Sequence, residues 1–296
     1  MEEIARDVAV VPMMLVNAYL VGTAQSWVLV DSGTPGNTKK IKEAAEARFG
    51  PNTRPNALIL THGHFDHAGS ASDLGKLWNV KVYAHRLEWP FLTGRSPYPP
   101  MDPTAPGFFA ALSRFFPSRT TNVADRIADL NGSLPGLGLS DWEAIDTPGH
   151  TPGHVSFFRR SDGVLLAGDA FATVNMDNLL TLLTKKPQIY RPPVPATTDW
   201  QKARASVQFL AALRPRVIGA GHGSPMANAA DQLESLAANF PVPQHGRYVQ
   251  EPARFDENGI AYLPPAPPDR TPKIAAGVAI GAVLAAAGAS MLRKKA

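Results

Sequence analysis

Short apolar runs and longer segments with helical spacing alternate along the chain. Residues 28–30 and 57–60 are apolar runs that end in turn residues, which is typical of buried strands, whereas 38–49 has a helical pattern that stops at a Gly-Pro pair. The apolar run 8–21 is interrupted by a proline and an asparagine, so it predicts two strands joined by a turn. Further strands are predicted at 80–84, 142–146, 154–159, 164–167 and 217–220, and further helices at 70–77 and, after a capping box at 198–201, to about 213. This alternation predicts a layered α/β fold.

Residues 87–135 break the alternation. The segment is rich in proline, which excludes long regular elements, and aromatic residues are interleaved with the prolines. We interpret it as an inserted flap that lies over apolar material, with a short helix near 108–116. Two roles stay open for its aromatic side chains, a local core and the wall of a substrate pocket.

The composition narrows the classes of chemistry. Over 296 residues, 44% hydrophobic residues suffice for a sizeable core, and the lack of cysteine excludes disulfides, iron–sulfur clusters and thiol nucleophiles. The net charge of +4 resides in residues 273–296, where Lys273, Arg293, Lys294 and Lys295 occur without any acidic residue. The rest of the chain is therefore neutral, which argues against nucleic acid as a partner.

The C-terminal region predicts a membrane anchor. Residues 1–262 are expected to form the catalytic domain, 263–273 a Pro-rich linker, and 274–292 a transmembrane or membrane-anchoring helix. The nineteen uncharged residues 274–292 would span about 29 Å as a helix, close to the thickness of a bilayer core. An Ala-rich helix packed on the domain is the alternative.

The localisation expected from these segments is at a membrane, with the catalytic domain in the cytoplasm because the acidic N-terminus lacks the features of a signal peptide. Gly277 and Gly281 have the G-x-x-x-G spacing that brings two membrane helices together, so a homodimer is a further expectation.

Four candidate metal ligands occur within six residues, directly after the strand predicted at 57–60: His62, His64, Asp66 and His67. Imidazole and carboxylate suit zinc and similar divalent metals. A tight loop, helped by the glycine at 63, can direct one pair of these side chains to one point and the second pair to another. Three further candidates lie at strand ends or adjoining turns: His150, Asp169 and His222.

This set of residues resembles the metallo-β-lactamase superfamily, whose signature is H-x-H-x-D-H followed by a distant His, an Asp and a last His. The resemblance covers about residues 8–239, with all elements in the family's order. It implies an αββα sandwich, in which two sheets face each other with helices outside. It also implies two divalent metal ions, zinc being expected, the first bound by His62, His64 and His150, the second by Asp66, His67 and His222, with Asp169 bridging them.

Two further residues are expected to support the ligands. Asp31 matches the family's first element, an Asp behind the metal loop, although a turn-starting Asp that caps its own loop is equally consistent with the sequence. His154 follows His150 by four residues, and we interpret it as a supporting or structural residue instead of a ligand.

The predicted function is metal-dependent hydrolysis of a small-molecule ester, thioester, lactone or β-lactam-like amide. Two close divalent ions bring the pKa of a shared water near neutrality and polarise the substrate oxygen, so no serine or cysteine nucleophile is needed. Asp66 is the expected catalytic residue, because it can both bind metal and orient the nucleophile. The sequence does not indicate the substrate.

Other functions stay open. A mononuclear iron enzyme similar to the persulfide dioxygenases is the first alternative, whereas di-iron oxygen reducers usually have a carboxylate at the position of His64. A nuclease is disfavoured by the neutral body. A non-catalytic, membrane-tethered binding protein is disfavoured by the complete ligand set.

Overall fold

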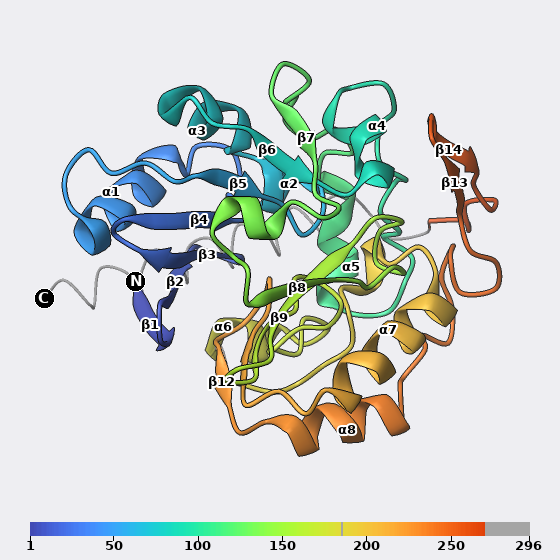
Figure 1. The fold of residues 1–296 in the computed structure, drawn as a ribbon. Coiled ribbons are helices and arrows are strands. Elements are labelled where there is room, and N and C mark those ends of the chain that lie inside the picture. Colours follow the sequence, from blue (N-terminus) through green and yellow to red (C-terminus); the bar gives the residue numbers. More distant parts are fainter. Residues whose placement is uncertain (185, 270–296) are drawn as a thin grey trace, which may run out of the picture.

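The computed structural model describes residues 1–184 and 186–269 (Figure 1). Within these residues the strands form a seven-stranded sheet, a five-stranded sheet and a two-stranded hairpin. The two large sheets lie face to face, with α1 and α3 outside the first and α7 and α8 outside the second (Figure 1). The predicted layered α/β architecture is thereby confirmed.

The first sheet contains the strands of the N-terminal half in sequential order. Its first four strands pair antiparallel and its last four pair parallel, so that β4, β5, β6 and β7 all end at the same edge. The strands are β1 (Glu2–Ala5), β2 (Val8–Pro12), β3 (Asn17–Thr23), β4 (Ser26–Val30), β5 (Ala57–Ile59), β6 (Val82–Ala84) and β7 (Ile127–Asp129).

The second sheet has the order β12-β11-β10-β9-β8, and its one parallel pair is β10 with β11. Its strands are β8 (Trp142–Asp146), β9 (Val155–Arg159), β10 (Val164–Leu166), β11 (Val217–Gly219) and β12 (Met226–Ala227). A separate hairpin is formed by β13 (Arg254–Asp256) and β14 (Gly259–Tyr262).

The helices cover the outer faces or line the edge between the sheets. They are α1 (Thr38–Phe49), α2 (Phe65–Ala68), α3 (Ala71–Trp78), α4 (Trp89–Leu92), α5 (Phe108–Leu112), α6 (Leu179–Thr184), α7 (Trp200–Ala212) and α8 (Ala230–Ala238). Short 3-10 turns lie at η1 (Arg86–Glu88), η2 (Ser113–Phe115), η3 (Leu134–Leu137) and η4 (Val194–Ala196).

Alternation along β4 shows how the layers are held together. Leu29 is fully buried and packs with α1 and α3, whereas its neighbours Val28 and Val30 pack against the second sheet with Phe157. Successive strand side chains point to opposite faces, so one strand contributes to both apolar layers. Each fully buried side chain of this size contributes about 1.5–3 kcal/mol relative to an exposed one.

Most of the predicted elements are confirmed, with differences at their ends. The predicted capping box begins at Thr198, but this residue is not the cap of α7. Asp199 is the cap, and its side chain accepts from the backbone N–H groups of Gln201 and Lys202. The Thr198 hydroxyl donates to the carbonyl of His150 instead. The segment 87–135, predicted as a flap, includes α4 and α5 but also β7, which pairs with β6 in the first sheet.

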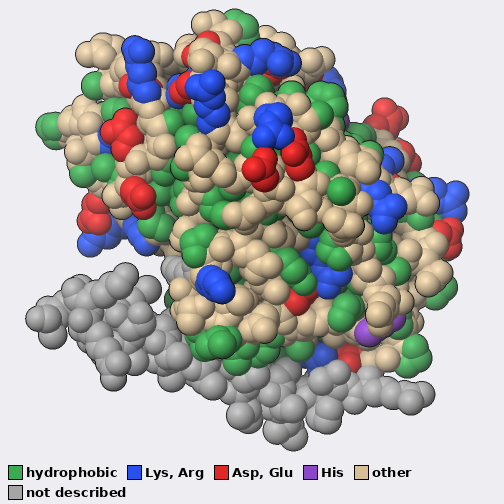
Figure 2. All heavy atoms as spheres, turned by 90° about the horizontal axis from the view of Figure 1, so that it is seen from below, with side chains coloured by type: hydrophobic (Ala, Val, Ile, Leu, Met, Phe, Trp, Pro, Cys, Tyr) green, Lys and Arg blue, Asp and Glu red, His purple; other side chains and the backbone are tan. Residues whose placement is uncertain are grey.

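The face opposite the first sheet carries mixed charges. Figure 2 shows Lys and Arg side chains interspersed with Asp and Glu among uncharged areas. Arg214, for example, pairs with Asp231 at 2.9 Å and also with Glu234, both on α8. Charges of both signs are thus mixed on this face, without being gathered into one basic patch.

The prediction of a membrane-associated protein needs correction. Within residues 1–184 and 186–269, no helix is both long and apolar enough to cross a bilayer. Even the 13-residue α7 rises only about 20 Å, against about 30 Å for the apolar core of a bilayer. This finding contradicts the predicted localisation, and residues 274–292, with Gly277 and Gly281, lie outside the described residues.

Candidate metal centre

The His-rich loop begins where β5 ends, and Asp31 at the end of the neighbouring β4 holds it at both ends. One Asp31 oxygen accepts from the backbone N–H of Thr61 at 2.8 Å, and the other from the Thr61 hydroxyl and from Nδ1 of His67, both at 2.8 Å. With Nδ1 occupied by a carboxylate, Nε2 of His67 is directed into the site. Such carboxylate–imidazole pairs are common behind metal ligands.

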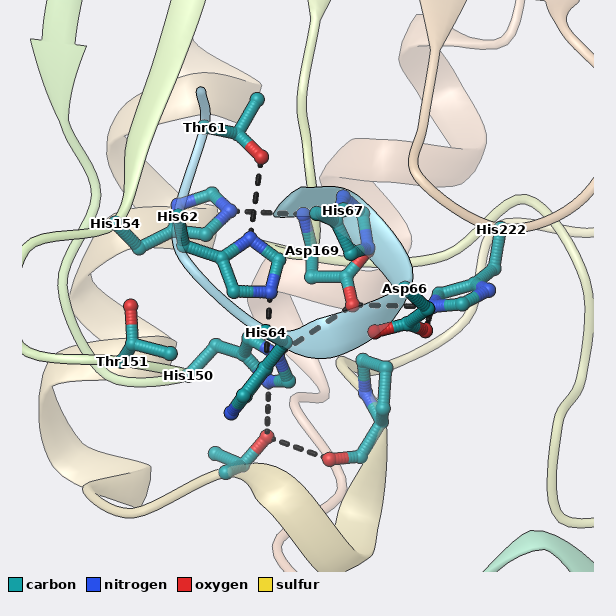
Figure 3. Close-up of polar contacts among 12 residues, drawn as sticks. Thr61, His62, His64, Asp66, His67, His150, Thr151, His154, Asp169 and His222 are labelled. Carbon is teal, nitrogen blue, oxygen red and sulfur yellow. Dashed lines mark hydrogen bonds and ion pairs between the residues drawn. The ribbon is translucent and has the colours of Figure 1, made fainter. Parts of the chain in front are cut away.

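Three imidazole nitrogens converge at one point beside this loop (Figure 3). Nδ1 of His64 lies 2.9 Å from Nε2 of His62 and 3.0 Å from Nε2 of His150. A ring nitrogen carries either one hydrogen or one lone pair, so one nitrogen cannot satisfy two others as hydrogen-bond partners. The arrangement is that of ligands around a shared cation, and imidazole nitrogens are ligands that zinc prefers.

Burial keeps these three rings neutral, the form that binds metal. It lowers the pKa of His64 to about 3, and it holds the pKa values of His62 and His150 well below their usual range, with help from the neighbouring imidazoles.

A second group of side chains meets on the other side of the loop. Nε2 of His222 lies 3.6 Å from a carboxylate oxygen of Asp66, and Asp66, His67 and His222 present ligand atoms close enough to hold one ion. Nδ1 of His222 contacts the carbonyl of Leu15 at 2.5 Å, which orients Nε2 toward the site.

Asp169 lies between the two groups (Figure 3). Its Oδ2 is 3.4 Å from Nε2 of His150 and 3.1 Å from Nε2 of His222, while its Oδ1 is 3.4 Å from Nε2 of His67. Among the described residues, neither Oδ1 of Asp169 nor Nε2 of His67 has a hydrogen-bond partner, although both are buried. An unpaired buried polar atom costs about 1–3 kcal/mol, and a divalent cation would satisfy both atoms.

The charges around Asp169 also favour a cation. Burial alone would lower the pKa of His67, but the carboxylates of Asp169 and Asp31 raise it well above its usual range. Burial alone would raise the pKa of Asp169, but His222 and His67 hold it well below its usual range. This part of the site therefore stabilises positive charge beside a carboxylate, and metal binding would displace the proton of His67.

Two predicted residues differ from the others: His154 has both ring nitrogens hydrogen-bonded to the protein, and Asp66 is partly exposed. His154 accepts from the backbone N–H of Asp169 at 2.8 Å and uses its other nitrogen to bond the Thr147 hydroxyl at 2.8 Å, so both of its ring nitrogens are occupied by the protein. Asp66 is the most exposed candidate ligand, with 14% of its side chain accessible.

Sequence reasoning missed Glu88 and Tyr98. Glu88 is fully buried beside the metal loop and accepts a hydrogen bond from the backbone N–H of Gly63 at 3.0 Å and another from the Tyr98 hydroxyl. Burial raises its pKa. The position of Glu88 in the order of elements could have indicated its place in the site. It lies in η1, which follows β6, and β6 ends at the same sheet edge as β5.

Aromatic side chains lie next to the Asp66 and His222 side of the site. The Phe109 ring lies 6.2 Å from the His222 ring, and the Phe116 ring lies 5.3 Å from Phe109 and 5.5 Å from Phe65. Phe109 and Phe116 belong to the segment predicted as a flap, so this part of the segment borders the candidate metal centre.

A tight backbone approach at Gly221 gives a prediction for the site. A Cβ at this position would lie 2.1 Å from Oδ1 of Asp169 and 2.5 Å from a ring carbon of His67, so Gly221→Ala must displace both side chains. We expect it to weaken metal binding by about 10–100-fold, the range found when residues behind metal ligands are changed. Competition with a chromophoric chelator measures this change.

Gly136→Ala is the matched control, because a Cβ there meets nothing within 4 Å. Equal metal affinity in the Gly221→Ala and Gly136→Ala variants would contradict the placement of Asp169 and His67 in the metal centre.

Comparisons with known proteins show which family the chain is similar to. Residues 12–222 match the model of the metallo-beta-lactamase superfamily. The chain is 38% identical over 243 residues to the probable metallo-hydrolase YflN of Bacillus subtilis (strain 168), covering 79% of this chain and 91% of that one. It is 32% identical over 112 residues to the hydroxyacylglutathione hydrolase GloC of Haemophilus influenzae, covering 38% and 48% of the two chains.

Among solved structures, the BLEG-1 B3 metallo-beta-lactamase has the same fold, with a TM-score of 0.55 and 24% identity over 77% of this chain and 99% of that one. The family match covers most of the chain, and the relative in B. subtilis is aligned over nearly its whole length. The chain therefore belongs to the metallo-beta-lactamase superfamily.

Proposed function

We propose that the protein is a dinuclear metal-dependent hydrolase of a small ester, thioester, lactone or β-lactam-like substrate, with zinc as the metal. The observation that carries this proposal is the position of Asp169, whose carboxylate lies within 3.4 Å of nitrogens from both groups of candidate ligands. One carboxylate in contact with both groups favours two ions held close together over two independent sites.

The residues fit two divalent ions. His62, His64 and His150 would hold one ion, Asp66, His67 and His222 would hold the other, and Asp169 would bridge them. Two ions held in this way would supply a nucleophilic water of nearly neutral pKa and would polarise the scissile carbonyl.

The protein itself would orient the attacking water and the ligands. Asp66 is suited to orient the attacking water, because it is the most exposed candidate ligand and its carboxylate accepts hydrogen bonds. Asp31 keeps His67 in the tautomer that directs Nε2 into the site. The burial of the remaining ligands leaves the Asp66 side as the open approach for substrate.

The surroundings favour an apolar part on the substrate. The rings of Phe65, Phe109 and Phe116 border the site. A cavity of about 150 Å³ at Gly223, the residue after His222, is lined by Leu15, Val174 and Leu182 among other apolar side chains, together with polar ones such as Asn17. Apolar pockets with a few polar groups are typical of small-molecule sites. One of the relatives compared above is the hydroxyacylglutathione hydrolase GloC. Thioesters are therefore the first substrate class to test.

An activity panel with metal analysis tests the proposal. Purified full-length protein is assayed against thioesters, lactones, β-lactams and phosphodiesters while its metal content is measured by mass spectrometry. We expect two zinc ions per chain and hydrolysis of at least one acyl substrate, lost on chelation and restored by zinc. Hydrolysis that persists in metal-free protein would refute the proposal, and one iron with persulfide oxidation would identify the alternative enzyme.

A further inference from the structure

Glu88 is a buried carboxylate whose four hydrogen bonds all come from uncharged donors. It lies in η1, just after β6, and none of its surface is accessible. Its Oε2 accepts from the backbone N–H of Gly63 at 3.0 Å and from the Tyr98 hydroxyl, and its Oε1 accepts from the Thr151 hydroxyl and the backbone N–H of Gly153, both at 2.8 Å. Burying a carboxylate is costly, so such a position requires this complete set of partners.

Three of the four donors come from two segments that carry ligands. Gly63 separates His62 from His64 in the loop after β5, and Thr151 directly follows His150 in the turn before β9. Glu88 therefore links the segments that hold the three converging imidazoles. The gap between these segments sets the distance of 3.0 Å between His64 and His150.

Both oxygens of Glu88 have to act as acceptors. Each faces one backbone N–H, from Gly63 on one side and Gly153 on the other, and a backbone N–H cannot accept a hydrogen bond. An amide in place of the carboxylate would direct its own N–H at one of these two donors. The glutamine side chain has nearly the same shape, so Glu88→Gln changes the hydrogen bonding and leaves the packing intact.

Tyr98 contacts both Glu88 and the His64 ring. Its hydroxyl accepts from the backbone N–H of Gly63 at 2.8 Å and donates to Glu88, and its ring lies 4.5 Å from the His64 ring. A Cβ on residue 63 would lie 2.5 Å from the Tyr98 hydroxyl, so the glycine permits this close approach.

The second group of ligands is held by other contacts. His67 is held through Nδ1 by Asp31, and His222 through Nδ1 by the carbonyl of Leu15. Neither contact involves Glu88. Asp31 also binds Thr61 next to His62, so it is shared by the two groups, whereas Glu88 contacts only the segments of the first group.

We propose that Glu88 is a positioning residue that sets the spacing of His62 and His64 against His150, and that it thereby controls the affinity of the first metal group without controlling the second. This inference rests on the proposed function, because it presupposes that both groups bind metal. It adds that Glu88, which is not itself a ligand, affects the binding of one ion of the centre and not of the other.

Zinc titration of the metal-free, full-length protein in competition with a chromophoric chelator tests the inference. Wild type is expected to show two binding constants, and Glu88→Gln to weaken one of them by about 10–100-fold while changing the other by less than about threefold. The weakened constant should be the one that His150→Ala abolishes. Asp102→Asn is the matched control, because Asp102 is also a buried carboxylate that accepts from a backbone N–H, that of Arg247, outside the ligand segments.

The outcomes separate the inference from the proposed function. The inference is overturned if Glu88→Gln weakens both binding constants equally, as a general loosening of the site would. It is also overturned if Glu88→Gln weakens neither constant. Fewer than two binding constants in the wild type overturns the proposed function instead. If Glu88→Gln shows no cooperative melting, Thr151→Val decides: it removes one donor to Glu88 and should weaken the same constant at least threefold, and no effect there overturns the inference.

Discussion

An Asp169→Ala variant is expected to lose at least about a hundredfold in kcat/KM and to bind fewer than two metal ions. Removing a residue that supports a ligand already costs about 10–100-fold in metal affinity or activity, and Asp169 is itself a candidate ligand of both ions. Its loss would leave Nε2 of His67, His150 and His222 without the carboxylate that lies 3.1–3.4 Å from them. Steady-state kinetics on a substrate found in the panel, with metal counted by mass spectrometry, measure both effects.

Asp146→Ala serves as the control for this variant. Asp146 ends β8, and its side chain is 74% exposed, so its removal should change neither the metal count nor turnover. An Asp169→Ala protein with two bound metals and normal kcat/KM would show that the carboxylate is not a bridge.

Removal of the metal ions is expected to lower the melting temperature by about 5–10 °C for each site. A ligand present at about a hundred times its Kd stabilises the native state by about 2.7 kcal/mol, and 1 kcal/mol corresponds to about 2–4 °C in a domain of this size. The structure adds a reason: buried atoms such as Oδ1 of Asp169 have no other partner among the described residues. Thermal melting with chelator, and again after zinc is restored, measures the shift.

Asp169→Ala is the internal control for the melting experiment as well. Because it should bind less metal, the chelator should shift its melting temperature less than that of the wild type. Identical melting curves of wild-type protein with and without chelator would argue against a metal centre in the folded protein.

The sequence predicted those parts of the molecule in which the signal is local. Four of the seven candidate ligands lie within 62–67, so the cluster is visible without knowing the fold, and strands such as β4 and β10 have apolar patterns that fit a buried position. Placing His150, Asp169 and His222 with that cluster required the family resemblance, because nothing local links residues so far apart in sequence.

The parts that were missed depend on tertiary contacts. Glu88 occurs in a charged stretch that resembles an exposed turn, and its partners are 10–65 residues away. The three residues of β7 are only half-buried and lack a strong strand pattern, and the parallel pairing with β6 supplies their structure. Thr198 matched a cap motif, but its hydroxyl is used in contacts to the segment of His150, which leaves the capping of α7 to Asp199.

The distribution of the candidate ligands over the two sheets has a consequence for the order of folding. The segment 62–67 follows a strand of the first sheet, whereas His150, Asp169 and His222 all follow strands of the second. Neither half can complete a coordination sphere before the sheets dock, and the last ligand emerges from the ribosome long after the first. Metal would therefore act as a crosslink that forms late, closing the interface between the two sheets, and a nascent chain that has made only its N-terminal half would hold metal weakly.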